Sequence, residues 1–374
     1  MRTVTALAIA LSWSATAAAW SPPGIALYGI VEIPTINGGS ISTAAVNNHG
    51  DVAGSFVATN TFGPFLYQHD TGVTNALDLP APEPGSPPFG LALGINDNRV
   101  VVGQTDTTVG NRAIMWFTSG GFELLPDPNT IFFLTSATAV NNRGLVAGML
   151  ALGPNTEGLL WSVPEQSVTN FPSLQCRTCT GSFDHVNAIN HRGNVVGSSM
   201  YAITTETEFV LASGRHAVEW EDGNIKDLGA LNGSNSSEAT AINDADEIVG
   251  ESAISSDSGA AIHAFLFRRG QMLDLGTLEG DVSSSATGID DRGVIVGAST
   301  AAANDQGVMA TRPFVYLNGH MLDLNSVLDS TSPLADFVTL QAATAISSNG
   351  DWIAANGFDS RGGPPKAYLL MRLR

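Results

Sequence analysis

The chain reads Ala45-Val46-Asn47-Asn48-His49-Gly50-Asp51-Val52-Ala53-Gly54 near its start, and six related phrases follow it. Each phrase combines an apolar pair, a polar turn and an apolar run that ends in Gly or Ala. The other copies span Gly94–Gly103, Ala139–Gly148, Ala188–Gly197, Ala241–Gly250, Gly288–Gly297 and Ala345–Ala354. Copies begin roughly 45 to 57 residues apart, which indicates a tandem array and not a sum of unlike domains.

Each repeat is expected to form four short antiparallel strands. The fourth turn position of the phrase is usually Gly, as at Gly50, where a type I turn that closes a hairpin needs a left-handed residue. A second hairpin follows, with His263–Phe267 and Met272–Gly276 on either side of a tight turn. Asp222-Gly223 and Asn318-Gly319 mark the same turn in other copies, because both central positions need positive φ.

The strands are apolar on both faces, as in Val100-Val101-Val102, so each small sheet must be covered on both sides. Four-stranded sheets packed face to face around an axis meet this need, and the sequence therefore predicts an all-β, seven-bladed β-propeller. A parallel β-helix is the alternative, but its coils are shorter and lack tight hairpins. The seventh copy stops after Lys366–Leu370, and Leu27–Ile33 is expected to supply its fourth strand and close the ring.

Residues 1–19 have the features of a signal peptide, because Arg2 is the only charge, Val4–Trp13 is apolar, and Ala17-Ala18-Ala19 offers small residues for cleavage. A membrane anchor is the alternative, but polar residues interrupt the short apolar stretch. We expect an exported, monomeric chain of residues 20–374 that forms one propeller domain without a transmembrane segment, periplasmic or secreted. The net charge of −19 argues against nucleic acid as a partner.

The two cysteines, Cys176 and Cys179, lie together in Cys-Arg-Thr-Cys. In a reducing compartment this spacing suggests half of a zinc site or a redox pair. The chain has no second Cys pair and no strand-to-helix context for a redox motif, and export favours oxidation. We therefore predict a local disulfide that pins one loop.

The fifth copy carries a further signature, in which His263-Ala264-Phe265 and Asp274-Leu275-Gly276-Thr277-Leu278 follow the phrase. His216-Ala217-Val218 with Asp227-Leu228-Gly229 is a near match in the fourth copy. This pattern resembles the bacterial extracellular HAF repeat family, named for its His-Ala-Phe. The resemblance covers nearly the whole mature chain, although the first and third copies depart from it. It implies export and a propeller fold, and it supplies no catalytic residues.

Charged residues recur at two aligned positions of the repeat. A basic residue opens the third strand and an acid lies on the fourth, and counting outward from the turns puts both on one face. A His beside a carboxylate is also found in catalytic dyads and metal sites, but repetition around the ring favours structural ion pairs. The expected pairs are His216 with Asp227, His263 with Asp274, Arg312 with Asp323, Arg112 with Glu123 and Lys366 with Glu32, while Glu157 in the third copy faces uncharged Asn170.

No catalytic constellation emerges, because the seven His residues form none and no Gly-x-Ser-x-Gly element is present. Asp244, Asp246 and Glu247 alternate in the fifth turn like the ligands of a calcium loop. The Gly and the distal Glu of an EF-hand are missing, and Asp is a common turn residue. We therefore predict no cofactor, with calcium at these three residues as the alternative.

Loop lengths distinguish the two faces of the predicted ring. Most turns between the first and second and between the third and fourth strands are short, and we call the face that carries them the tight-turn face. The other connections vary, as in Ala58–Phe62 against Ser199–Gly214, and they form the variable-loop face, which we expect to bind the ligand. The candidate acidic residues of this face are Asp106, Glu157, Asp184, Glu206, Glu208, Asp257, Asp281 and Asp305. The tight-turn face carries Arg99, Arg143, Arg192 and Arg292.

The acidic candidates predict a cation, a basic protein or a glycan as the extracellular partner. A solvated surface that only keeps an exported protein soluble is the alternative. Three functions stay open: a binding or interaction module, which the missing catalytic residues favour; an extracellular enzyme, such as a glycoside hydrolase or lyase, that uses acidic loop residues; and a purely structural repeat protein. The sequence does not identify the ligand.

Overall fold

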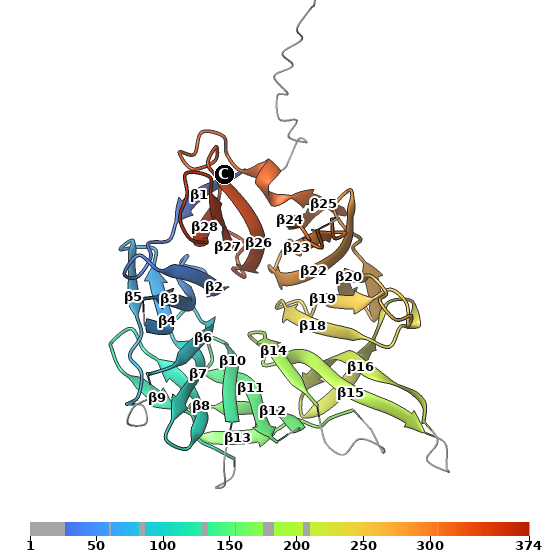
Figure 1. Cartoon of the computed structure of the whole chain (residues 1–374). Coiled ribbons are helices and arrows are strands. Elements are labelled where there is room, and N and C mark those ends of the chain that lie inside the picture. Colours follow the sequence, from blue (N-terminus) through green and yellow to red (C-terminus); the bar gives the residue numbers. More distant parts are fainter. Residues whose placement is uncertain are drawn as a thin grey trace, which may run out of the picture.

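The computed structural model describes residues 27–59, 61–81, 87–128, 134–153, 155–174, 183–204, 210–304 and 306–373. These residues form seven four-stranded antiparallel sheets arranged in a ring, which is a β-propeller (Figure 1). The expected signal peptide and the expected disulfide between Cys176 and Cys179 lie outside the described residues. Within the described part, no helix has the length and apolar character needed to cross a membrane.

The seven blades are numbered after the seven copies of the phrase. Blade 1 holds β2 (Ser40–Val46), β3 (Val52–Ala58), β4 (Thr61–Gln68) and β5 (Val73–Ala76). Blade 2 holds β6 (Gly90–Ile95), β7 (Val101–Thr107), β8 (Gly110–Trp116) and β9 (Phe122–Leu124). Blade 3 holds β10 (Leu134–Val140), β11 (Leu145–Leu152), β12 (Asn155–Ser162) and β13 (Ser167–Asn170). Blade 4 holds β14 (His185–Ile189), β15 (Val195–Thr204), β16 (Val210–Glu221) and β17 (Asn224–Gly229).

Blade 5 holds β18 (Ser237–Ile242), β19 (Ile248–Ala253), β20 (Ile262–Arg268) and β21 (Gln271–Asp274). Blade 6 holds β22 (Asp281–Ile289), β23 (Ile295–Ala301), β24 (Thr311–Leu317) and β25 (His320–Asp323). Two 3-10 helices, η1 (Leu231–Gly233) and η2 (Leu324–Val327), follow the last strands of blades 4 and 6. In each blade the first strand lies nearest the centre of the ring (Figure 1).

Blade 7 is built from both ends of the described chain, which confirms the predicted closure. It holds β26 (Val338–Ile346), β27 (Trp352–Asp359), β28 (Lys366–Arg372) and the N-terminal β1 (Tyr28–Glu32). β1 and β28 are antiparallel, with Tyr28 opposite Arg372. Tyr28, Ile30 and Ile33 are buried, so the closing segment adds to the core and covers the edge of β28.

The Gly that ends most copies of the phrase has a steric cause. The first strand of every blade carries a register shift, such as the one between Ala239 and Ala241. At Gly250 a Cβ would lie 2.0 Å from the carbonyl oxygen of Glu238, and at Gly197 it would lie 1.8 Å from that of His185. The bulged strand therefore occupies the place of a side chain, and glycine relieves the overlap.

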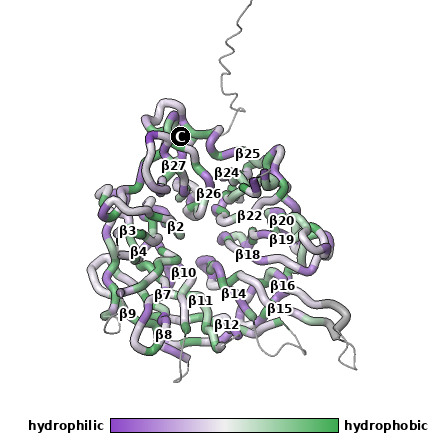
Figure 2. Tube along the Cα trace, in the orientation of Figure 1, coloured by the Kyte–Doolittle hydropathy of each residue, from purple (hydrophilic) through white to green (hydrophobic). Residues whose placement is uncertain are grey.

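Large aromatic side chains connect neighbouring blades. Three tryptophans on third strands are each 1% exposed, and each indole N–H donates to a backbone carbonyl of the preceding blade. The bonds run from Trp116 to Asp78 (2.6 Å), Trp161 to Pro126 (2.7 Å) and Trp220 to Pro172 (2.8 Å). Buried indole needs such a partner for its N–H. Figure 2 shows hydrophobic residues along strands such as β20 and hydrophilic ones where β14 reaches the central opening.

Candidate functional site

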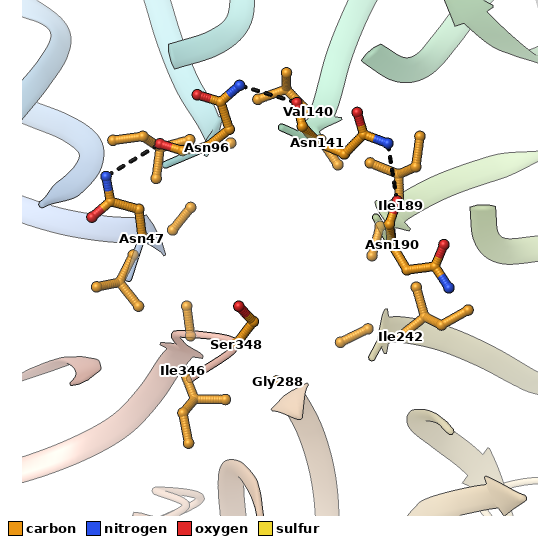
Figure 3. A pocket seen from close by; sticks show the side chains of 18 of the residues that line it. Asn47, Asn96, Val140, Asn141, Ile189, Asn190, Ile242, Gly288, Ile346 and Ser348 are labelled. Carbon is orange, nitrogen blue, oxygen red and sulfur yellow. Dashed lines mark hydrogen bonds between the residues drawn. The ribbon is translucent and has the colours of Figure 1, made fainter. Parts of the chain in front are cut away.

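A pocket of about 470 Å³ opens at the centre of the ring on the tight-turn face. All seven blades line it through the first strand and the turn that follows (Figure 3). Deep in the pocket the wall is formed by earlier residues of the first strands, such as Ala44, Thr138 and Thr240. Above them the wall has three levels, formed by consecutive residues of the repeated phrase. The lowest level is a ring of β-branched apolar side chains, namely Val46, Ile95, Val140, Ile189, Ile242, Ile289 and Ile346.

The middle level is an asparagine ring that ties neighbouring blades together. Each amide nitrogen donates to the backbone carbonyl of the equivalent residue in the next blade, at 3.0 to 3.2 Å, and three of these bonds are drawn in Figure 3. Each amide oxygen accepts from backbone N–H groups of its own turn. The ring comprises Asn47, Asn96, Asn141, Asn190 and Asn243, and it ends at Asp290 and Ser347, whose side chains have no amide to donate.

The upper level is the rim of the pocket, formed by Asn48, Asp97, Asn142, His191, Asp244, Asp291 and Ser348. The Asp97 carboxylate accepts from the Asn48 and Asn142 amides at 2.9 and 2.8 Å. Asp244 Oδ1 accepts from the backbone N–H of His191 at 2.8 Å, and Asp291 Oδ1 accepts from the backbone N–H of Asp244 at 3.0 Å. Asp244 and Asp291 are exposed, and no described residue donates to their second oxygens. These two carboxylates therefore keep open acceptors beside the pocket.

The rim is short of positive charge, because no Lys or Arg is among the described residues that line the pocket. Partial desolvation of the Asp291 carboxyl in its turn raises its pKa, and the nearby carboxylates of Asp244 and Asp290 raise it further, against the lowering effect of the Asp244 backbone N–H. The arginines predicted on this face are engaged elsewhere, in contacts of Arg99 with Asp51 and Asp70, Arg192 with Asp246, Arg292 with Asp290, and Arg143 with the Arg192 carbonyl.

The acidic residues predicted on the variable-loop face lie in different settings. Asp106 and Asp257 are exposed, and Asp257 accepts a bond from Ser255 at 3.0 Å. Glu157 accepts from the Asn170 amide at 2.7 Å, in the pairing that the sequence indicated. Three further candidates, Glu206, Glu208 and Asp305, lie outside the described residues.

Asp184 and Asp281 are not part of an exposed acidic surface. Asp184 is fully buried and accepts from Ser173 at 2.6 Å. Burial raises the pKa of Asp184, and the serine bonds oppose this effect only in part. The Asp281 side chain is 3% exposed and lies 3.0 Å from Arg312. Each of these carboxylates is thus buried and contacts a side chain of the protein, Asp184 with Ser173 and Asp281 with Arg312.

The recurring charged pairs are brought together as the aligned positions indicated. The His216 and His263 imidazoles lie 2.9 and 3.0 Å from the carboxylates of Asp227 and Asp274. The Arg312 guanidinium lies 3.6 Å from Asp323, farther than from Asp281. Lys366 lies 2.9 Å from Glu32, across the closure of blade 7.

Arg112 has a different partner from the one expected, because it contacts Asp127 at 2.9 Å and not Glu123. The register explains the change. Leu124 lies opposite Ile114, in the place that Asp274 takes opposite Phe265 in blade 5. Glu123 is therefore one residue out of register, and a shift of one residue turns a side chain to the other face of the sheet.

The calcium candidates are held by protein groups. Asp246 accepts from the amides of Asn190 and Asn194 at 3.0 and 3.2 Å, and Glu247 accepts from Asn243 at 3.2 Å. Among the described residues, no group of three or more His, Cys, Asp or Glu side chains could hold a metal ion. Asp244, Asp246 and Glu247 are thus not assembled as a ligand set.

The rim and the asparagine ring are the features that the sequence interpretation missed, because Asn and Asp in a turn were attributed to turn chemistry alone. A signal was present. Asparagine opens the turn in five of seven copies, as at Asn47 and Asn243, although that position of a hairpin tolerates several residue types. Such constancy indicates a partner outside the turn.

Comparison with known proteins agrees on the fold. No protein-family model matches the chain, and no curated protein matches it. The β-propeller domain of the Trilobed protease from Pyrococcus furiosus is similar over 90% of this chain and 98% of that domain, with a TM-score of 0.55 and 9% identity. Acylaminoacyl peptidase from Pyrococcus horikoshii is similar over 90% of this chain, with a TM-score of 0.55 and 8% identity. This chain spans 52% of that peptidase. At such identity the likeness defines the class of protein, a β-propeller module.

Proposed function

We propose that this protein is a binding module that holds a basic segment of a partner protein over the central pocket of its tight-turn face. The pocket itself carries the proposal, because it is the place where all seven blades contribute polar groups to one opening. Export by residues 1–19 belongs to the same proposal, and it would bring the module to an extracellular or envelope partner.

The charges of the rim favour a positively charged group. Asp244 and Asp291 belong to neighbouring blades, each has an oxygen to which no described residue donates, and no Lys or Arg is among the described residues that line the pocket. An ammonium or guanidinium group placed between them would offset the repulsion between the two carboxylates, which adds to partial desolvation in raising the pKa of Asp291. Oppositely charged surfaces also speed the encounter of the two partners.

The size and the apolar level of the pocket favour a chain segment. About 470 Å³ accommodates one or two side chains and not a folded domain. A Lys or Arg on the rim and a neighbouring apolar side chain above Ile242 and Ile346, which are each 8% exposed, would contact both the rim and the apolar ring. A glycan lacks this combination, and no Phe, Tyr or Trp is among the described residues that line the pocket to stack on a sugar ring.

The test is calorimetric titration with a short peptide that has an Ile between two Lys residues, against the same peptide with acetylated lysines. The unmodified peptide should bind, binding should weaken as salt rises, and acetylation should abolish it. Asp244→Asn with Asp291→Asn should weaken binding by ~10-fold, and Asp106→Asn on the other face is the matched control. Equal binding of the acetylated peptide, or an equal effect of Asp106→Asn, would refute the proposal.

A further inference from the structure

A second opening lies between blades 4 and 5, at the end of the ring opposite the central pocket. It is a crevice of about 240 Å³, formed where β18 begins, β19 ends and β20 begins. Its polar and apolar walls include Arg215, Ser236, Glu238, Glu251 and Ile262. These ends of the strands belong to the variable-loop face, away from the groups that form the rim.

The repeat itself marks this crevice as unusual. Register aligns Glu251 with Ser55, Gln104, Met149, Ser198, Ala298 and Asn356 of the other blades. Register aligns Arg215 with Phe62, Asn111, Thr156, Ile262, Thr311 and Pro365. No other blade has a charge at either position. A feature needed for the scaffold would recur, so a set of charges found once is a candidate for function.

The charged groups of the crevice differ in whether protein groups already form hydrogen bonds with them. Glu238 accepts from the Asn187 amide at 2.9 Å, and the His185 imidazole lies 3.5 Å away. Burial raises the pKa of Glu238, but the bonds from His185 and Asn187 outweigh it and hold the pKa below its ordinary value. Glu238 is therefore a carboxylate at neutral pH.

Glu251 and Arg215 are the open groups. Glu251 lies directly opposite Glu238 on the neighbouring strand, and no described residue donates to its carboxylate. Arg215 has Glu238 as its only described acidic contact, at 3.7 Å, which is too long for a hydrogen bond. Its side chain is 35% exposed, so the guanidinium keeps most of its donors available.

The crevice thus offers a carboxylate pair beside a guanidinium fork. A carboxylate pair recognises an ammonium group, and the fork of an arginine binds a carboxylate through two parallel hydrogen bonds. The ligand that presents both groups a short distance apart is an α-amino acid. Ile262, 40% exposed at the mouth, adds an apolar contact for a side chain.

We propose that the crevice between blades 4 and 5 binds a free α-amino acid, with its carboxylate on Arg215 and its ammonium group on Glu251 and Glu238. The volume of about 240 Å³ fits a ligand of this size and leaves little room for a longer chain. The site is separate from the central pocket, so its occupancy does not depend on the function proposed for that pocket.

The experiment is calorimetric titration of the full mature chain with the standard amino acids, each tested singly, and with two analogues of L-leucine. Leucinamide lacks the carboxylate and 4-methylpentanoate lacks the ammonium group. L-leucine should bind, and each analogue should bind at least ~10-fold more weakly, because hydrogen bonds to charged groups are among the stronger ones. Addition of the basic peptide should not displace leucine.

Two variants locate the binding to the crevice. Arg215→Gln and Glu251→Gln should each weaken leucine binding by ~10-fold or more, and Arg215→Lys should fail to restore the wild-type affinity because lysine lacks the fork. The matched controls are Arg268→Gln, on an arginine that is 51% exposed elsewhere in blade 5, and Glu165→Gln in an exposed turn of blade 3. The analogues test the site even if a variant does not fold. Absence of binding by every amino acid at ~10 mM, equal binding of leucinamide, or equal affinities of Arg215→Gln and the controls would overturn the proposal.

Discussion

The asparagine ring makes a quantitative prediction about stability, which is sharpest at Asn141. This side chain is 6% exposed and makes three hydrogen bonds. Its amide donates to the Asn190 carbonyl of the next blade at 3.0 Å, and its oxygen accepts from the Arg143 and Leu145 N–H groups at 3.0 and 3.1 Å. At ~1 kcal/mol for each bond, Asn141→Ala should lower the free energy of unfolding by ~3 kcal/mol.

The residue at the equivalent position of blade 7 suggests a second variant, which should have an intermediate stability. Ser347 takes the equivalent position in blade 7, where its hydroxyl accepts from the Trp352 N–H at 3.1 Å and makes no bond to the next blade. Asn141→Ser should therefore keep part of the turn and lose the bond between blades, with a loss of ~1 to 2 kcal/mol. Asn98→Ala is the control, because this exposed side chain makes one bond of 3.3 Å, and we expect a change within ~0.5 kcal/mol.

Urea unfolding followed by tryptophan fluorescence would measure the three variants, with the slope of the transition checked against the wild type. The order of stability should be Asn98→Ala, then Asn141→Ser, then Asn141→Ala. If Asn141→Ala unfolds at the same urea concentration as Asn98→Ala, then the ring does not join the blades energetically.

Three further predictions concern other parts of the ring. The folded-state pKa of Asp184 is raised by burial, so this acid supports the fold when protonated, below its unfolded pKa, and that support is lost as the pH rises through the folded value. Asp184→Asn should thus melt at or above the wild-type melting temperature at pH ~7, and the difference between the two melting temperatures should vanish below pH ~4. A variant that is less stable than the wild type at neutral pH would contradict this. His263→Ala removes the 3.0 Å contact with Asp274, and we expect a small loss of melting temperature with unchanged binding of the basic peptide, whereas lost binding at an unchanged melting temperature would count against a structural role. Deletion of residues 27–33 exposes the apolar edge of β28 and removes three buried side chains worth ~5 to 9 kcal/mol, so gel filtration should show association, and a stable monomer would argue against the closure.

Much of the fold was predictable because its determinants are local in sequence. Gly50 and its equivalents place the first turn of each blade, and Asn318-Gly319 and its equivalents place the last. The missing fourth strand after Leu370 pointed to the N-terminal segment, since an open sheet edge must be covered. The pairs of His216 and His263 with their acids followed from counting outward along two strands joined by a tight turn.

The candidate sites were less predictable, because they depend on distances between blades. The sequence favoured the variable-loop face, yet the larger pocket lies on the tight-turn face, where short turns from seven blades converge. Arg112 was assigned to Glu123, and a register displaced by one residue gave it Asp127 instead. The crevice needed three strands from two blades to bring Arg215, Glu238 and Glu251 together.

The sequence by itself determined the number of blades, their strands and the strand that closes the ring, because turn chemistry and hydrophobic periodicity act over a few residues. Only the tertiary structure decided why the phrase contains Asn and ends in Gly. The amide of Asn141 reaches the backbone of a blade 49 residues farther along the chain, and the bulge beside Gly250 leaves no space for a Cβ. The first effect arises when the blades pack side by side in the ring, and the second arises within one blade, where the bulged first strand lies against the second strand.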